Sequence, residues 1–263
     1  MEGSPVDGGS PWFNPRTGKR LLPQALTSDS HMITKRLSEA RGHANHGWLD
    51  AYHSFSFASY RDPAFMGFSE LRVLNQDSIE PAQGFGTHGH DNMEIVTYVL
   101  SGALEHKDSM GNGSQILPGD VQLMSAGTGV THSEFNGRDD EQTTLLQMWV
   151  LPARRDTVPR YEQAHFPVAD RRGKLRLVVA PDGRDGSLTI GQNICLYAGL
   201  LDAGEATQLE FSRDRKGWLH VARGTLVLND VEFGPGDGAA IEHESLLRFE
   251  GRDDAEFVFF DLP

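Results

Sequence analysis

The sequence predicts an all-β protein made of two tandem antiparallel β-barrel domains, on three observations. Short runs rich in Val, Ile, Leu, Phe and Tyr recur about every ten residues from Ser69 onward, which is the spacing of an all-β sandwich or barrel. Gly, Asp, Asn and Pro, the residues that favour turns, separate these runs. No segment shows a sustained apolar period of 3.6 residues, so helices should be few and short.

The predicted strands fall into two groups with a polar segment between them. The runs are LRVLN (71–75), EIVTYVL (94–100), VQLMS (121–125), TLLQMWVL (144–151), LRLVV (175–179), ICLYAGLL (194–201), WLHVA (218–222), TLVLN (225–229) and FVFFDL (257–262). The segment PARRDTVPRYEQAHFP, with three prolines and many charges, interrupts the rhythm. We therefore predict a first domain over 32–152, a linker over 153–167 and a second domain over 168–263.

A faint internal repeat indicates that the two halves arose by duplication of one barrel. Gly102 opens GAL and is followed by Pro118-Gly119-Asp120, while Gly224 opens GTL and is followed by Pro235-Gly236-Asp237. The alternative is that such turns recur in any β protein.

Composition limits the classes of function. The formal charge of −13 comes from 24 basic and 37 acidic residues, and the basic residues are dispersed, which argues against binding to nucleic acid or anionic lipid. A neutral or electron-rich small molecule fits better, or a basic protein partner. A single cysteine, Cys195, allows no intrachain disulfide, and no apolar stretch approaches the roughly 20 residues of a membrane span. We expect a cytoplasmic protein, monomeric and without membrane contact.

The first 31 residues differ from the rest of the chain. Residues 1–30 are rich in Gly, Pro and Ser and lack the basic-then-apolar pattern of a secretory signal. We expect 1–31 to be a disordered extension or a tag, with the natural start at Met32 and a native tail as the alternative.

Two short segments carry residues that bind metals. His88 and His90 are two residues apart, so in an extended strand both imidazoles project from one face, and His132 and Glu134 repeat that spacing. If the two strands are neighbours and these faces point into a barrel, three nitrogens and one carboxylate oxygen converge. Two surface histidines would be the ordinary explanation of an isolated His-x-His, but the second alternating pair favours a metal site.

The ligand set narrows the kind of metal centre but not the metal. Three imidazoles and one carboxylate suit divalent iron, copper, nickel, zinc or manganese. Such a shell leaves one or two positions open for substrate or dioxygen, whereas a closed structural zinc site would usually contain cysteines.

These residues resemble the motifs of the cupin superfamily. Gly84, His88, His90, Glu94 and Gly102 approximate the first cupin motif, and His132 with Asn136 the end of the second. Counting forward from the histidines selects Glu94 as the acidic ligand, but counting back from Gly102 selects Ile95. We therefore expect Glu94 to point to the other face of its strand.

This departure is typical of the pirin family, in which the carboxylate ligand lies two residues after the histidine of the second motif. Glu134 occupies that position. Several stretches resemble pirin, among them GFGTHGHDNMEIVTYVLSGALEHKDSMGN, MSAGTGVTHSEFN and QMWVLP, and the similarity continues more weakly to the C-terminal FDLP. The resemblance covers nearly everything after residue 31.

The pirin resemblance implies a dioxygenase that opens the ring of a flavonol such as quercetin with dioxygen and releases carbon monoxide. It implies one divalent ion, foremost Fe(II), with Cu, Ni, Mn or Zn as alternatives, held by His88, His90, His132 and Glu134. Glu134 would also be the catalytic base. The alternatives are a redox sensor or transcriptional coregulator that acts through protein contacts, and a cupin whose metal is structural or missing.

The second half lacks matching ligands. The offsets of the four ligands, transferred to the second repeat, select Glu210, Ser212, Phe249 and Gly251, and the histidines of that half, His220 and His243, are isolated. We predict a metal-free second barrel.

Other residues invite a functional role for which a structural role is the simpler explanation. We expect local packing or hydrogen bonding for His43, His46 and His53. His106, between Glu105 and Lys107, should lie on a solvated face. Cys195, in an apolar run, should be a buried inert thiol. Gln147 and Trp149 alternate on a strand after Glu134, so one of them should line the pocket.

Overall fold

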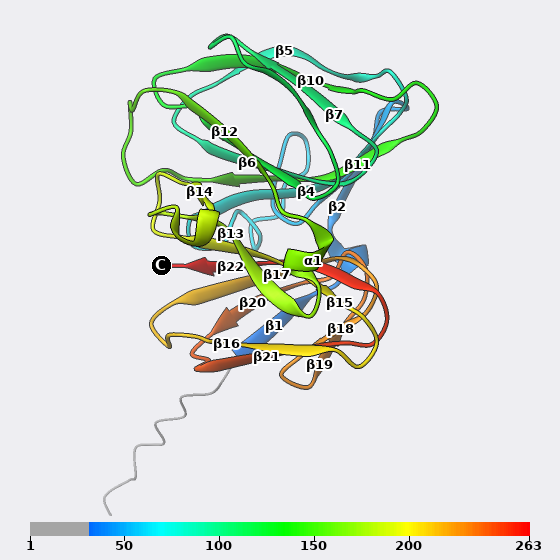
Figure 1. The fold of residues 1–263 in the computed structure, drawn as a ribbon, viewed down its shortest axis with the longest axis vertical. Coiled ribbons are helices and arrows are strands. Elements are labelled where there is room, and N and C mark those ends of the chain that lie inside the picture. The colour runs from blue at the N-terminus through cyan, green and yellow to red at the C-terminus, as the bar shows by residue number, and fades with distance from the viewer. Residues whose placement is uncertain (1–31) are drawn as a thin grey trace, which may run out of the picture. The chain divides into compact units, whose positions relative to one another are not determined.

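In the computed structural model, which describes residues 32–263, nearly all regular structure is β-strand (Figure 1). The helices of this part of the chain are α1 (Val168–Arg171) and the 3-10 turns η1 (Ser38–Ala40) and η2 (Arg184–Gly186), which confirms that helices are few and short. None of them is long and apolar enough to cross a membrane. The predicted N-terminal extension or tag, residues 1–31, lies outside the described residues.

Two sheets build the first half of the fold. One has seven strands in the order β12 (Arg160–His165), β9 (Asp120–Ser125), β6 (Glu94–Ser101), β11 (Thr143–Val150), β4 (Leu71–Ile79), β3 (Leu49–His53) and β2 (Gly42–Asn45). The other has four, in the order β5 (Gly84–His90), β10 (Val130–Asn136), β7 (Leu104–Asp108) and β8 (Gly113–Ile116).

The second half repeats this plan. Its seven-stranded sheet has the order β1 (Met32–Arg36), β20 (Gly238–Glu242), β17 (Lys216–Arg223), β22 (Ala255–Leu262), β15 (Cys195–Leu201), β13 (Lys174–Ala180) and β14 (Leu188–Thr189). Its four-stranded sheet has the order β16 (Ala206–Glu210), β21 (Leu246–Gly251), β18 (Leu226–Leu228) and β19 (Val231–Phe233). The pairings are antiparallel, apart from the short parallel pair β13 and β14.

The matching strand orders support duplication and confirm the predicted two-half, all-β class. In each half a seven-stranded and a four-stranded sheet pack face to face, so the hydrogen bonds do not close one continuous barrel. The repeated turns also match: Asp120 accepts a hydrogen bond from the backbone nitrogen of Leu117, and Asp237 accepts one from that of Gly234, each at 2.8 Å.

Two edge strands depart from the predicted domain division. β1 pairs with β20, so the described chain begins in the second half before it enters the first. β12 lies inside the predicted linker 153–167, yet it pairs with β9 along its whole length and extends the first half's sheet. Its charged and half-buried residues suit an exposed edge, and prolines before and after it limit the strand, which is why its sequence resembles a linker.

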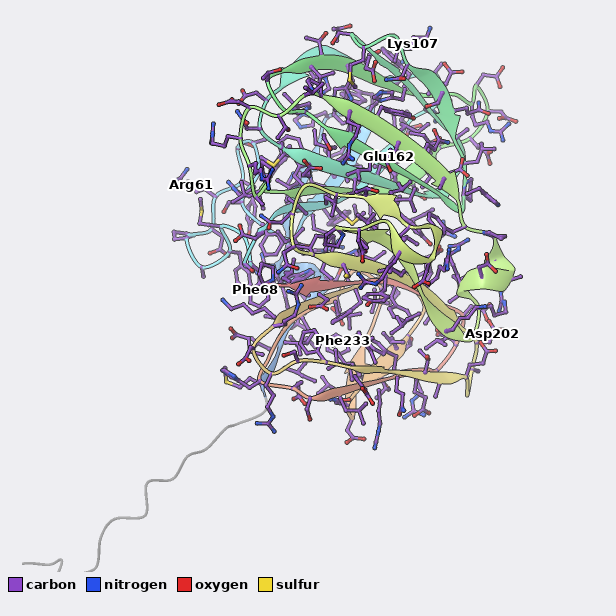
Figure 2. The ribbon with its side chains drawn as sticks, turned by 60° about the vertical axis from the view of Figure 1, so that its left-hand side comes forward. Arg61, Phe68, Lys107, Glu162, Asp202 and Phe233 are labelled. Carbon is purple, nitrogen blue, oxygen red and sulfur yellow. The ribbon has the colours of Figure 1, made fainter. Side chains whose placement is uncertain are left out.

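Three apolar layers hold the fold together. The largest lies between the two seven-stranded sheets and includes Tyr98 and Met148 of the first half and Trp218 and Phe260 of the second. Inside the second half a cluster rich in phenylalanine fills the space between its sheets, and in Figure 2 Phe233 lies within it, whereas Lys107 points outward from the first half. The first half's interior has smaller clusters that leave a cavity.

The register of the second half shows which residues replace the predicted ligands. Gly251 pairs with Leu226, two residues after Gly224, as Asn136 pairs with Leu104, two residues after Gly102. Phe249 therefore stands where Glu134 stands, and Leu247 where His132 does. The two offsets counted from the Pro-Gly-Asp turn, which selected Phe249 and Gly251, were wrong by two residues, since the stretch after this turn is shorter by two in the second half. The offset that selected Glu210 for His88 was wrong by one, since Leu209 lies opposite Leu247.

Candidate metal centre

The strands that carry the predicted ligands are neighbours. β5 and β10 pair antiparallel, with His88 directly opposite His132 and a register shift between His132 and Glu134. Along β10, His132 and Glu134 are buried while Thr131 and Phe135 are exposed, so the alternation turns both functional side chains inward. A Cβ atom on Gly84 would lie 2.2 Å from the carbonyl oxygen of Glu134, so glycine permits this close approach of β5.

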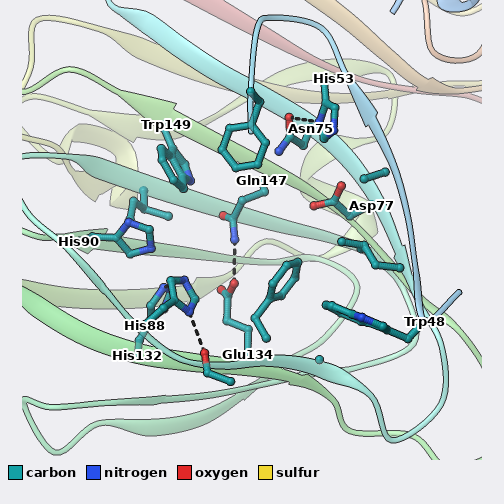
Figure 3. Close-up of a pocket in the computed structure, with 17 residues that line it drawn as sticks. Trp48, His53, Asn75, Asp77, His88, His90, His132, Glu134, Gln147 and Trp149 are labelled. Carbon is teal, nitrogen blue, oxygen red and sulfur yellow. Dashed lines mark hydrogen bonds between the residues drawn. The ribbon is translucent and has the colours of Figure 1, made fainter. Parts of the chain in front are cut away.

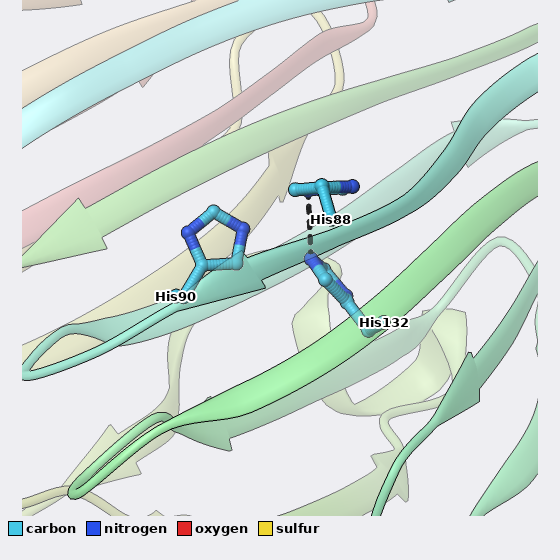
Figure 4. A group of neighbouring side chains, drawn as sticks. All are labelled: His88, His90 and His132. Carbon is cyan, nitrogen blue, oxygen red and sulfur yellow. Dashed lines mark hydrogen bonds between the residues drawn. The ribbon is translucent and has the colours of Figure 1, made fainter.

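Three imidazoles converge at this position (Figure 4). The nitrogens of His88, His90 and His132 lie within 4.8 Å of one another, and the Nε2 atoms of His88 and His132 are 3.1 Å apart. Nδ1 of His88 lies 2.9 Å from the carbonyl oxygen of Gly86. A carbonyl oxygen only accepts, so Nδ1 carries the proton and Nε2 keeps its lone pair toward His132.

This arrangement fits a bound cation. Two nitrogens that each lie about 2.1 Å from one ion, at right angles, are about 3 Å apart. Burial, and then the neighbouring histidines, lower the pKa of His132 to about 3 and that of His90 to about 4. Both rings are therefore neutral at pH 7, which is the form that offers a lone pair to a metal.

Glu134 lies beside the three imidazoles with one oxygen held and one without a partner. Its Oε2 accepts a hydrogen bond of 2.9 Å from Nε2 of Gln147, whose Oε1 accepts one from the Thr97 hydroxyl (Figure 3). Its Oε1 is buried and has no partner among the described residues. Burial raises the pKa of Glu134 to about 7, although the hydrogen bond from Gln147 lowers it.

The four predicted ligands do not all fall in one group of mutually close atoms. His88, His90 and His132 form one group, and Glu134 belongs to a second group with His106 and His132. His132 belongs to both groups, so the Glu134 carboxylate lies close to His132 but not to all three imidazoles at once.

The prediction for His106 was wrong. Its side chain is buried, because along β7 Glu105 and Lys107 face outward and His106, between them, faces inward. Gln122 donates to its Nδ1 at 3.0 Å, so its Nε2 carries the proton toward Asp108, 3.2 Å away. Both ring nitrogens are thus engaged, and the ring packs 5.3 Å from that of His132. The charged neighbours on either side concealed this inward position.

A cavity of about 410 Å³ adjoins the imidazoles. Much of its wall is aromatic, from Trp48, Phe57, Phe85 and Trp149, and the Trp149 ring stands edge-on to His90 at 4.9 Å. Both Gln147 and Trp149 line the cavity, where one of them was expected. This combination of an apolar wall and a few polar groups is typical of a site for a small aromatic ligand.

Glu94 faces away from the cavity, as predicted. It accepts a hydrogen bond of 2.7 Å from the Ser125 hydroxyl, and Ile95, the next residue, lines the cavity in its place.

The cavity also has a polar end that the sequence did not predict. Asp77, Asn75 and His53 line it, and all three are buried. His53 hydrogen-bonds Asn75 at 2.9 Å, as expected for a local structural role, but it also lines the cavity, which was not expected. Burial, and then the charges of Glu134 and Asp50, raise the pKa of Asp77 to about 8. The sequence did contain a pattern that could have indicated this polar end, since Asn75 and Asp77 occupy alternate positions of the otherwise apolar strand LRVLNQDSI.

The remaining sequence candidates lie apart from the cavity lining. His43 hydrogen-bonds Asp50 at 2.6 Å and stacks on Tyr52, in line with its predicted local role. Cys195 is buried, as expected, with the Arg184 guanidinium 3.1 Å from its sulfur.

Comparisons with known proteins agree with the fold. Residues 34–150 match the Pirin family model, and residues 177–262 match that of the quercetinase C-terminal cupin domain. Quercetin 2,3-dioxygenase of Escherichia coli K12 is 48% identical over 232 residues, 88% of this chain and 99% of that protein. A pirin-like protein of Caulobacter vibrioides is 40% identical over 231 residues, 88% of this chain and 99% of the relative.

A solved structure extends the comparison to metal binding. The crystal structure of the bacterial pirin YhhW from Escherichia coli in complex with nickel(II) has 47% sequence identity and a TM-score of 0.84, and the match covers 88% of this chain and 99% of that one. The family predicted from the sequence motifs is confirmed, and this chain belongs to the pirin family of two-domain cupin proteins.

Proposed function

We propose that the protein is a metal-dependent dioxygenase that opens the ring of a flavonol such as quercetin, with uptake of dioxygen and loss of carbon monoxide. The observation that carries this proposal is the convergence of His88, His90 and His132 at an aromatic-lined cavity. The name of the Escherichia coli relative, quercetin 2,3-dioxygenase, supports the same substrate class.

The proposed ligands are His88, His90, His132 and Glu134, and the proposed ion is Fe(II). Glu134 is included because its Oε1 is buried without a hydrogen-bond partner, beside His132. A divalent ion here would supply a Lewis acid for an acidic hydroxyl and a redox partner for dioxygen. The nickel(II) complex of YhhW supports metal binding by this family and leaves the choice of ion to experiment.

Glu134 is the proposed base. Burial makes its carboxylate a stronger base than an exposed one, so it can take the proton of a flavonol hydroxyl. Gln147 orients the carboxylate by donating to Oε2, and Thr97 fixes the direction of the amide by donating to the other end of Gln147. This chain of donors holds the carboxylate through Oε2 and leaves Oε1 for the proposed ion.

The aromatic wall positions the substrate and excludes water. A flat polyphenol can pack against Phe85 and Trp149, whose rings lie beside His88 and His90 respectively. We further propose that the second half holds no metal, and that the protein acts as a cytoplasmic monomer on a flavonol and dioxygen.

The test is loss of quercetin absorbance under air, with release of carbon monoxide, by protein reconstituted separately with iron, copper, nickel and manganese. We expect turnover with at least one ion, highest with iron, and activity at background for Glu134→Gln. His43→Ala is the matched control, since His43 is exposed and outside the cavity lining, and it should keep full activity. If every metal form binds its ion but leaves quercetin intact, the enzyme proposal is refuted and the sensor alternative gains.

A further inference from the structure

A buried carboxyl group faces the cavity from a different strand than any proposed ligand. Asp77 lies on β4, is 4% exposed and lines the cavity, and no described residue hydrogen-bonds its Oδ1. Figure 3 shows the carboxyl directed into the cavity, apart from the imidazoles. A buried carboxyl without a hydrogen-bond partner destabilises the folded state, so its presence requires an explanation.

Two other carboxyl groups of this half, both outside the proposed ligand set, are satisfied by the protein. Asp120 accepts hydrogen bonds from the backbone of Leu117 and from the side chains of Gln163 and His165. Asp108 accepts from the backbone of Met110 and from both nitrogens of Asn112. These carboxylates stabilise turns, which is the usual structural role of a buried aspartate, whereas Asp77 has no comparable set of donors.

The second half serves as an internal control for this position. Asp77 pairs with Leu145 in the first half, and Gly199 pairs with Phe257 at the corresponding place in the second. A Cβ atom on Gly199 would lie 2.5 Å from the Phe257 ring, so the second half fills this space with an aromatic side chain. The fold therefore does not need a carboxyl group here, and the one in the first half belongs to the cavity.

We propose that Asp77 is a specificity-determining residue that hydrogen-bonds a phenolic hydroxyl of the substrate, remote from the hydroxyl at the metal site. A phenol can donate to a carboxylate and accept from a carboxylic acid, so the contact is available in either protonation state of Asp77. The inference rests on the proposed function, because it names what the far end of the same cavity recognises.

The experiment compares two flavonols that share one ring system. Quercetin carries several hydroxyls, and 3-hydroxyflavone keeps only the one that would bind at the metal. Dissociation constants are measured with dioxygen removed, from the quenching of tryptophan fluorescence, since Trp48 and Trp149 line the cavity. Thermal unfolding of the same proteins without flavonol gives a second result that is independent of turnover.

We expect Asp77→Leu to weaken quercetin binding about 10–100-fold and 3-hydroxyflavone binding less than about threefold. Asp77→Asn keeps an acceptor oxygen and should stay within about fivefold of the parent for both. Removing the unpartnered carboxyl should also raise the Tm of Asp77→Leu by about 2–4 °C. Ser78→Ala, the next residue along β4 and half-buried, is the control and should change neither result.

Different results would contradict the role of Asp77 and the proposed function. Equal weakening of both flavonols by Asp77→Leu, or a fall in its Tm, would make Asp77 a structural residue and leave the proposed function intact. Binding of neither flavonol by the parent protein would refute the proposed function and this inference together.

Discussion

In the first half β10 turns His132 and Glu134 into the space between two sheets, while in the second half the matching strand β21 turns Leu247 and Phe249 into the same space. The central strands of the two halves follow the same order, so the inward side chains of these strands account for most of the difference between the two interiors. One interior is a cavity of about 410 Å³ with polar groups, and the other is a closed phenylalanine-rich core. The same scaffold therefore accommodates either a cavity or a closed core, and a few inward positions decide which half can bind a ligand.

The largest effect is expected when a metal ligand of the first half is replaced by the residue at the matching position of the second half. His132→Leu, which copies Leu247, should weaken metal binding on the order of a thousandfold and reduce turnover to background, because it removes the imidazole shared by both ligand groups. Metal content after dialysis measures the effect. The metal-free variant should unfold at an equal or higher temperature, since Nδ1 of His132 is a buried atom without a partner. Retention of one ion per chain at parental affinity would contradict the ligand assignment.

The next prediction concerns a cavity created by substitution in the core of the second half. Phe249→Ala removes a fully buried ring and should lower the free energy of unfolding by about 3 kcal/mol, while metal affinity stays within about twofold. Urea unfolding measures it, and Phe135→Ala, which removes an exposed ring, should cost less than about 1 kcal/mol. A large loss of metal affinity in Phe249→Ala would show that the halves are not independent in this respect.

A third prediction concerns Gln147, a polar residue of the cavity in the first half. Its amide lowers the pKa of Glu134, so Gln147→Leu should raise that pKa. A base works only when deprotonated, so the acidic limb of the pH-rate profile should move upward by about one pH unit and kcat at pH 7 should fall by up to about tenfold. Gln115→Ala, an exposed amide on β8, should leave the profile in place. An unchanged limb would separate Glu134 from the proton transfer.

The last prediction is a pH dependence of the stability of the metal-free protein, which arises from the carboxyl group of Asp77. Its folded pKa of about 8 lies above its usual value of 3.8, so the folded state binds more protons between these values. The parent protein should therefore lose stability relative to Asp77→Asn as the pH rises from about 4 to about 8, and not further above pH 8. A stability difference that is constant with pH would show that Asp77 does not titrate in this range.

Much of the fold and of the site followed from patterns within single strands. The spacing of His88 and His90, and of His132 and Glu134, predicted which side chains share a face, and the misfit of Glu94 to the cupin motif predicted that it turns away. These inferences succeed because alternation along a strand is local and fixed by backbone geometry.

Features that depend on distant pairing were missed. β1 joins the second half and β12 the first through hydrogen bonds to strands far along the chain, which no local composition records. The buried position of His106, and the meeting of Asp77 with the imidazole cavity, likewise depend on which sheet each strand faces. Polar side chains on an inward face remain ambiguous in sequence until the partner sheet is known.

The most direct test of the contrast between the halves is the anomalous difference map of a crystal loaded with the functional ion. We predict one strong peak per chain, within bonding distance of Nε2 of His88 and His132, of His90 and of Oε1 of Glu134, and no peak between the sheets of the second half. A peak in the second half, or an ion in the first half that Glu134 does not contact, would contradict this prediction.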